Sequence, residues 1–384
     1  MSFEDSAEYI AKAKNLFTIG AAFTTNTSKG HDFFDISTHT LAALNTRTTG
    51  YSFLDKSLNG GYSNKTLVVL MGGPKTGKSM WLCNLAAQSV KNGYNTLYIT
   101  LELPYQKVSQ RIGANMFNIP MAQYNETVKD NNLFAKKVQE FRTNQLGKLG
   151  TFILEEFPTS TATAEMNEAF AIKKQEEISA LTGKDFKFDN VYIDYLNIMR
   201  DMKNPNSENT YLKIKSICED VRAMAQRNEW CVISVTQTNR GGTESSDLNM
   251  TDVSESAGLT ATVDALFGII RTTMMRAEGC YYLKAVAMRD SPLMGCKKRY
   301  TFNDTYLRLA EDLTEEIIAD GVDIPSIYVS ATANGVAKYQ QNNRGYNNQT
   351  PQQPAPIQQG TPLIQTPQLG ISESQLTGAD LFKM

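Results

Sequence analysis

The sequence predicts an α/β protein built on a mostly parallel sheet that helices cover on both faces. Between residues 51 and 312, apolar segments typical of strands alternate with longer segments typical of helices. The strand candidates are continuous apolar runs, as expected of strands buried on both faces: TLVVLMG, NTLYITLE, TFILEEF, FDNVYIDYL, CVISVTQ and DALFGIIR. We expect helices between them at 78–91, 104–117, 164–181 and 208–228. Three β-rich stretches that follow at short spacing, CYYLKAVAM, KKRYTFN and YLRLAED, predict an antiparallel extension of the sheet.

Segments of different character flank this 51–312 core. Residues 1–50 form an arm in which we expect two short helical segments, at 7–17 and 32–45, and residues 313–333 form a C-terminal extension. Residues 334–370 are rich in Gln, Asn and Pro and nearly uncharged. Such a composition cannot bury enough apolar surface to fold, so this linker is predicted to be disordered. Residues 371–384 regain apolar side chains and are interpreted either as a peptide that docks on a partner or as an end without a role.

The composition limits the chemistry that the chain can perform. Five cysteines stand singly without a CxxC pair, which is typical of reduced thiols in a cytosolic protein. His31 and His39 are the only histidines, so a zinc site or a Ser-His-Asp triad is not expected. A net charge of -2 gives no global basic field, and any contact with nucleic acid must come from a local cationic lining. Neither a membrane-spanning run nor a secretory leader is expected, which favours a cytoplasmic protein.

A phosphate-binding loop is the strongest single motif. One segment fits the pattern GxxxxGK[ST] and lies between an apolar strand and a helix: Gly72, Gly73, Pro74, Lys75, Thr76, Gly77, Lys78 and Ser79. Its glycines allow backbone N–H groups to point at phosphates at a helix N-terminus. Lys78 is expected to reach the β- and γ-phosphates, and the Ser79 hydroxyl to ligate Mg²⁺. The motif therefore predicts ATP and Mg²⁺ as cofactors, with a chance glycine turn as the alternative.

Polar side chains end three of the predicted strands. Glu102 ends NTLYITLE and is a candidate general base for the attacking water. Asp194 ends FDNVYID, as expected of an acid that supports Mg²⁺, and Gln237 ends CVISVTQ, where an amide can sense the γ-phosphate. Because ligands bind at the carboxyl ends of parallel strands, these residues and the loop are expected to form one site. The alternatives are an exposed glutamate at a helix start, a strand-end acid by chance, and an amide that bonds to the loop backbone.

A family resemblance rests on five motifs in order: GGPKTGKS, YITLELP, VYIDYL, SVTQTNRG and SESAGLTATVDALFGIIR. Together they resemble the ATPase domain of DnaB-type hexameric helicases over about residues 30–310. The segments GHDFF, NLAAQSVKNGYNTLYITLE and DLNMTDVSESAGLTATVD look most like the replicative helicases of T-even phages. The resemblance implies a RecA-like domain in a six-membered ring on single-stranded DNA. It further implies ATP-driven 5′→3′ unwinding at a replication fork, in the cytoplasm of a phage-infected bacterium.

The resemblance also implies that each ATP lies between subunits and is completed by an arginine finger from the neighbour. The finger strand of the family matches residues 283–289, so Arg289 is the candidate that neutralises charge on the γ-phosphate. One departure is Ala287, where the family usually has lysine. Either Arg289 acts alone or a neighbouring cation substitutes, and without the resemblance Arg289 would be interpreted as a surface arginine on a β-edge.

The DNA-binding loops of the family correspond to residues 200–215 and 240–251. Within them Arg240, Lys203 and Lys213 are the candidates for contact with the DNA backbone, without reading sequence. Acidic residues in the same loops dilute the positive charge, so two solvated loops are the alternative.

Partners and rival functions follow from the ends of the chain. Family members carry an N-terminal domain of over a hundred residues that engages primase, whereas about 50 residues precede the core here. Segment 32–45 corresponds to the family's linker helix, which supports ring formation. Whether the chain also forms a primase-binding collar stays an open question. The 371–384 peptide is a candidate for docking on replisome proteins. The rival interpretations are a RecA-like recombinase that forms filaments on DNA and a non-unwinding ATPase that scaffolds or loads another helicase.

Overall fold

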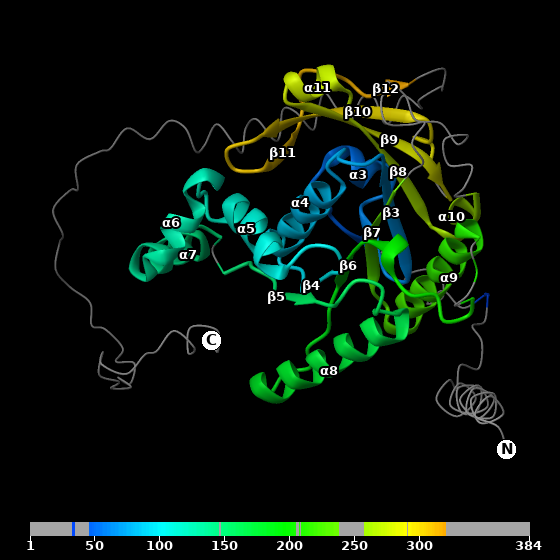
Figure 1. The fold of residues 1–384 in the computed structure, drawn as a ribbon, viewed down its shortest axis with the longest axis horizontal. Helices are drawn as coiled ribbons and strands as arrows, with labels where there is room; N and C mark the ends of the chain where they lie inside the picture. Colours follow the sequence, from blue (N-terminus) through cyan, green and yellow to red (C-terminus); the bar gives the residue numbers. More distant parts are fainter. Residues whose placement is uncertain are drawn as a thin grey trace. The chain divides into compact units, whose positions relative to one another are not determined.

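A ten-stranded sheet organises the protein (Figure 1). The computed structural model describes residues 33–34, 46–145, 147–204, 207, 209–237, 257–289 and 291–319, all of which belong to the unit Met1–Ala331. Apart from residues 33–34, the expected arm segments 7–17 and 32–45 lie outside the described residues. The linker 334–370 and the peptide 371–384 lie outside them as well.

The parallel part of the sheet confirms the predicted fold class. Its strands are adjacent in the following order: β8 (Ala265–Ile270), β3 (Thr66–Gly72), β7 (Cys231–Gln237), β6 (Asn190–Asp194), β4 (Thr96–Thr100) and β5 (Phe152–Glu156). The strand that leads into the phosphate loop, β3, is therefore flanked by β7 and β8. All carboxyl ends of these parallel strands lie at one edge of the sheet, where the site was expected.

The antiparallel extension is also confirmed. It consists of β9 (Cys280–Met288), β10 (Cys296–Asn303), β11 (Arg308–Glu311) and β12 (Ile318–Ala319), and β9 pairs with β8. Since β9 runs opposite to β8, the end of β9 lies beside the start of β8, with Met288 opposite Ala265. A separate two-stranded sheet joins β1 (Thr46–Arg47) to β2 (Tyr62–Ser63).

Helices pack on both faces of the sheet, because side chains along each buried strand point alternately to the two sides. On one side, Val68 and Leu70 of β3 belong to the same apolar cluster as Trp81 of α4 (Lys78–Lys91). On the other side, Leu67 and Val69 belong to a second cluster with α9 (Thr210–Asn228). Helix α5 (Tyr105–Met116) packs beside α4, whereas α8 (Ala164–Thr182) and α10 (Ala257–Thr262) pack beside α9.

Several short elements were not expected from the sequence: α3 (Ser52–Ser57), η2 (Met121–Gln123), α6 (Tyr124–Lys129), α7 (Asn131–Asn144), η3 (Leu196–Ile198) and α11 (Thr273–Ala277). Helix α7 buries only Phe141, so its apolar periodicity is weak. The signal in the sequence that could have predicted the start of α7 was its N-cap residue, Asp130. The Asp130 side chain accepts hydrogen bonds from the N–H groups of Asn132 and Leu133.

The cysteines match the compositional expectation. All five cysteines are buried and free, as expected of reduced thiols. Among the described helices, none combines the length and the apolar character needed to cross a membrane.

Candidate nucleotide site

The phosphate loop connects β3 to α4 through a tight turn that requires glycine. Gly77, at the N-cap of α4, has φ of 96°, a left-handed conformation that residues with a Cβ rarely adopt. A Cβ at this position would lie 2.6 Å from the Tyr281 hydroxyl oxygen. The aromatic ring of β9 therefore packs directly against the loop backbone, and the glycine of the motif is needed for this contact as well as for the turn.

Two side chains of the loop fold back on its own backbone. The Thr76 hydroxyl donates to the Gly73 carbonyl at 2.8 Å, and the Lys78 ammonium donates to the same carbonyl at 2.9 Å. Burial lowers the pKa of Lys78, and the carboxylates of Glu102 and Asp194 oppose that shift. Lys78 is thus partly buried at the N-terminus of α4 and close to two acids, which is the position needed for a lysine that binds phosphate.

Asp194 and Ser79 meet across the sheet edge, as predicted. The Ser79 hydroxyl donates to Oδ1 of Asp194 at 3.2 Å, and the Tyr98 hydroxyl donates to Oδ2 at 3.1 Å. Burial raises the pKa of Asp194 to about 6, although the hydrogen bonds from Ser79 and Tyr98 lower it, and the Glu102 charge adds to the rise. A hydroxyl and a carboxylate are hard oxygen donors, so this pair fits Mg²⁺, which usually takes few protein ligands beside water and phosphate.

The position of Glu102 differs from the prediction in one respect. Strand β4 ends at Thr100, so Glu102 lies in a bend beyond the strand and is exposed. The chain turns because the Thr100 hydroxyl both donates to the Leu103 carbonyl and accepts from the Leu103 N–H. Glu102 nevertheless acts electrostatically on both Lys78 and Asp194, which places its carboxylate at the same edge of the sheet.

Gln237 ends β7 directly beside the phosphate loop. It is the register partner of Gly72, the first glycine of the motif, and it is exposed. Its backbone N–H donates to Oδ1 of Asn197 at 3.2 Å, and this oxygen also accepts from the Thr236 hydroxyl at 2.8 Å. The sequence interpretation missed Asn197, which follows Asp194 within η3 and ties the ends of β6 and β7 together.

Two arginines beside the loop were also missed. Arg276 donates through Nη2 to the carbonyl of Lys75 at 3.1 Å. The guanidinium of Arg271 lies 4.1 Å from the centroid of the Tyr281 ring, in cation–π geometry, and donates to the Tyr281 hydroxyl. Arg271 directly follows β8, the neighbour of β3, so the rule that selected the other strand-end residues would have found it.

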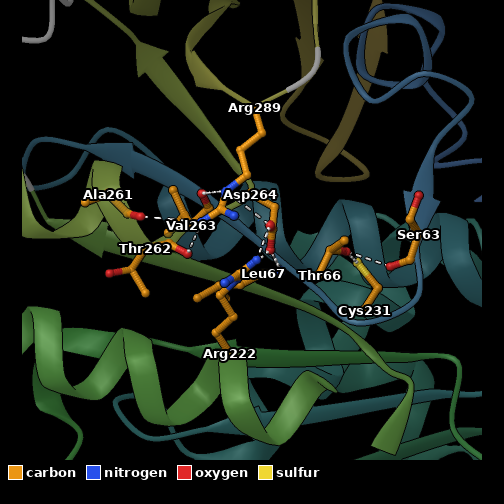
Figure 2. A network of polar contacts seen from close by, with 10 residues as sticks. All are labelled: Ser63, Thr66, Leu67, Arg222, Cys231, Ala261, Thr262, Val263, Asp264 and Arg289. Atoms are coloured by element: carbon orange, nitrogen blue, oxygen red, sulfur yellow. Dashed lines mark hydrogen bonds and ion pairs between the residues drawn. The ribbon is translucent and has the colours of Figure 1, made fainter. Parts of the chain in front are cut away.

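Arg289 lies at the opposite end of the sheet from the loop. It follows β9, and its backbone N–H donates to the carbonyl of Asp264 at 3.2 Å, just before β8 begins. Asp264 in turn contacts Leu67, near the start of β3 (Figure 2). At roughly 3.3 Å per residue, the strand from Leu67 to Gly72 spans about 16 Å. The Arg289 side chain therefore does not reach the phosphate loop of its own chain.

The three candidate DNA contacts have different surroundings. Lys203 forms an ion pair with Asp220 of α9, and Lys213 is half-buried in the first turn of the same helix. Arg240 lies outside the described residues. Within the described part of the chain, Lys203 and Lys213 make no contact with the phosphate loop, and the role of all three residues in DNA binding stays a prediction.

Taken with the parallel sheet, the phosphate loop and the Ser79–Asp194 pair place the chain in the class of P-loop nucleotide hydrolases. The sequence profile of the DnaB-like helicase C terminal domain matches residues 47–299, and the chain belongs to this family.

Two curated relatives illustrate the similarity. The DnaB-like replicative helicase of Enterobacteria phage T4 is 31% identical over 269 residues, which cover 68% of this chain and 54% of the relative. The replicative DNA helicase DnaB of Rickettsia bellii is 24% identical over 289 residues, 71% of this chain and 52% of the relative. The chain thus spans about half the length of the curated relatives that it matches.

Two solved structures share the fold. One, described as an ATPase domain, superposes with a TM-score of 0.57 at 16% identity, over 78% of this chain and 97% of that one. The other, described as a DnaB-like replicative helicase and its interactions with primase, gives a TM-score of 0.57 at 17% identity, over 76% and 66% of the two chains. The predicted RecA-like P-loop fold is confirmed by these neighbours.

Proposed function

We propose that this chain is the ATP-hydrolysing motor of a replicative DNA helicase. The observation that supports it is the position of the predicted site residues at two ends of one sheet. The phosphate loop with Lys78, Ser79 and Asp194 lies at the carboxyl edge, and Arg289 lies at the amino edge of the same subunit. Family membership supports the helicase assignment, and the T4 and Rickettsia relatives carry the printed description of replicative helicases.

Hydrolysis at the carboxyl edge follows from the residues assembled there. The loop N–H groups and Lys78 would hold the phosphates of ATP, while Ser79 and Asp194 would hold Mg²⁺ directly or through water. A metal ion held there would supply neutralisation of phosphate charge. Glu102 is exposed beside these groups, so it can accept the proton of the attacking water. Gln237, in register with Gly72, senses the γ-phosphate and passes its state to the residues that follow β7.

The second half of the reaction requires another copy of the chain. In this proposal Arg289 contacts the γ-phosphate that a neighbouring subunit holds, and a ring of six copies gives every phosphate loop such a neighbour. The family usually carries a lysine at position 287, and this chain has alanine there. In this proposal Arg289, two residues further along the finger strand, supplies the positive charge without that lysine. Hydrolysis and subunit contact are thereby coupled.

Single-stranded DNA at a fork is the proposed track, with Arg240, Lys203 and Lys213 on its backbone. Docking of the 371–384 peptide on other replisome proteins, and action in the cytoplasm of a phage-infected bacterium, belong to the same proposal. One structural neighbour is described with its interactions with primase, which makes primase a partner to test here.

Unwinding of a forked DNA substrate with ATP and Mg²⁺ tests the proposal. The full-length chain is expected to separate the strands, and Lys78→Ala is expected to abolish separation while it stays folded. Lys136→Ala, which removes an exposed lysine of α7, is the matched control and is expected to unwind normally. ATP hydrolysis on single-stranded DNA without any strand separation would refute the motor and favour the scaffold or loader.

A further inference from the structure

The guanidinium of Arg289 rests on a defined set of acceptors at the amino edge of the sheet (Figure 2). Its Nε lies 3.3 Å from the Val263 carbonyl, and its Nη2 lies 3.4 Å from the carbonyls of Ala261 and Thr262. Its Nε also lies 3.4 Å from Oδ1 of Asp264. We call Ala261, Thr262, Val263 and Asp264 the Arg289 dock. Every one of these contacts is longer than the usual hydrogen bond between charged partners, so the guanidinium is held loosely.

Asp264 itself is held firmly. Arg222 of α9 donates to both of its oxygens, from Nη2 to Oδ1 at 2.9 Å and from Nε to Oδ2 at 3.2 Å. The backbone N–H of Leu67 donates to Oδ2 at 2.9 Å, and the Asp264 N–H returns a bond to the Leu67 carbonyl at 3.0 Å. The bidentate pair and the strand contact fix both the direction and the position of the carboxylate.

One carboxylate therefore faces two guanidinium groups, as Figure 2 shows with Asp264 between Arg222 and Arg289. Arg222 makes the shorter contacts, at 2.9 and 3.2 Å, and Arg289 makes the longer one, at 3.4 Å. The three side chains together carry a surplus of one positive charge, which favours the approach of an anion. The Arg289 side chain is 44% exposed, compared with 25% for Arg222, so the anion meets Arg289 first.

Space beside Arg289 allows the side chain to leave the dock. A hollow of about 180 Å³ opens next to it, lined by Asp264 and Met288 together with Ser57, Asn59 and Gly61. The guanidinium therefore has free volume beside it into which it can turn when a stronger anion approaches.

We propose that Asp264, oriented by Arg222, is a positioning residue that holds Arg289 at the subunit surface, ready for the γ-phosphate bound by a neighbouring copy. This inference rests on the proposed role of Arg289 in the neighbour's site. The fixed carboxylate prevents the guanidinium from folding elsewhere, while the length of its contacts lets the guanidinium transfer to the stronger anion.

Steady-state ATP hydrolysis on oligo(dT) by the full-length chain tests this positioning. Asp264→Asn is expected to lower kcat about 10-fold with KM for ATP within two-fold, because the loop that binds ATP is intact in each subunit. Arg289→Ala is expected to lower kcat further, and the double variant is expected to match Arg289→Ala alone, because Asp264 acts only through Arg289. The matched control is Glu168→Gln, which breaks a similar carboxylate–arginine pair between Glu168 of α8 and Arg227 of α9, and is expected to stay within two-fold.

Mixed oligomers separate positioning from a loss of folding. Lys78→Ala subunits have a normal Arg289 and no ATPase activity of their own. When they are mixed with Asp264→Asn subunits, ATP hydrolysis is expected to recover at the intact phosphate loops of the Asp264→Asn subunits. If Asp264→Asn does not fold, Arg222→Lys replaces it, since loss of the bidentate pair releases the carboxylate; a three-fold or larger drop in kcat at constant KM is then expected.

Normal kcat for the folded Asp264→Asn chain, or additive losses in the double variant, would overturn the positioning role while leaving the trans role of Arg289 intact. Wild-type activity of Arg289→Ala would overturn the trans role itself, and the positioning role with it.

Discussion

The two ends of the parallel sheet differ in how tightly their functional side chains are held. At the carboxyl edge, Asp194 and Thr76 are almost completely buried, and the Thr76 hydroxyl donates to the Gly73 carbonyl at 2.8 Å. At the amino edge, Arg289 is half-exposed and its contacts measure 3.3 Å or more. The carboxyl edge is therefore a preorganised site for a ligand, whereas the amino edge presents a movable side chain.

Under the proposed function, each edge supplies half of a catalytic site, and the difference between the edges suits that division. A buried, prealigned edge suits the binding of phosphate and metal, which occurs within one subunit. An exposed arginine on a fixed carboxylate suits a contact that forms and breaks with each cycle between subunits. The same fold thus supplies both halves, and only a second copy of the chain brings them together.

The largest expected effect comes from removing the amino-edge half. Arg289→Ala is expected to lower the ATPase activity of the oligomer by about 10³-fold or more, as for other arginine fingers. Binding of a fluorescent ATP analogue to the subunit is expected to be unchanged, because Arg289 does not reach its own loop. Mixing Arg289→Ala with Lys78→Ala subunits is expected to recover activity, and a mixture as inactive as its components would refute the division of the site.

A smaller loss is expected from the exposed acid at the carboxyl edge. Glu102→Gln is expected to reduce kcat by about 10²-fold, the usual contribution of a general base, with ATP affinity retained. Glu126→Gln on α6, also exposed, serves as the control. Single-turnover hydrolysis separates the chemical step from product release, and an unchanged chemical rate would exclude Glu102 as the base.

The buried acid predicts an effect on stability that depends on pH. Because its pKa in the folded state is raised from 3.8 to about 6, Asp194 favours folding below about pH 4 and loses that contribution as pH rises through 6. Asp194→Asn is neutral at every pH. At pH 8 its free energy of unfolding is therefore expected to exceed that of the wild type by up to about 3 kcal/mol, so it unfolds at a higher denaturant concentration. The gain is expected to vanish near pH 4.

Unfolding by urea without Mg²⁺ measures this difference, since bound metal would favour the ionised carboxylate. The variant is expected to lose ATPase activity while it gains stability at pH 8. An equal stability difference at pH 4 and pH 8 would show that the charge of Asp194 carries no penalty.

The smallest expected effect concerns communication out of the carboxyl edge. Gln237→Ala is expected to reduce the stimulation of ATPase activity by single-stranded DNA about 10-fold and to leave the basal rate nearly unchanged. The physical reason is that Gln237 lies beside Gly72, while its bond to Asn197 is made by its backbone and so survives the loss of the side chain. Asn197→Ala is expected to lower both rates, since Asn197 anchors the ends of two strands; equal behaviour of the two variants would contradict a specific role for the Gln237 side chain.

The sequence by itself determined the class of fold and the predicted site residues at the carboxyl edge of the sheet. A phosphate loop is contiguous, so its residue types and spacing are visible without any structure, and buried parallel strands appear as continuous apolar runs. The ends of β6 and β7 were correctly placed at Asp194 and Gln237, because an apolar run that stops at a polar residue marks the edge of the sheet. The same reasoning extended β4 too far, since the turn that Thr100 makes with Leu103 interrupts the strand before Glu102.

Only the tertiary structure decided which distant residues meet. Ser79 and Asp194 are separated by 115 positions and touch because α4 and β6 converge at one edge. Asp264 lies between Arg222 and Arg289 because the start of β8 is next to α9, which carries Arg222, and next to the end of β9, which Arg289 follows. No local pattern encodes such a meeting, because it depends on strand order and on the reversal of β9. The fixed carboxylate and the movable arginine are therefore properties of the folded chain, whereas the phosphate loop is a property of the sequence.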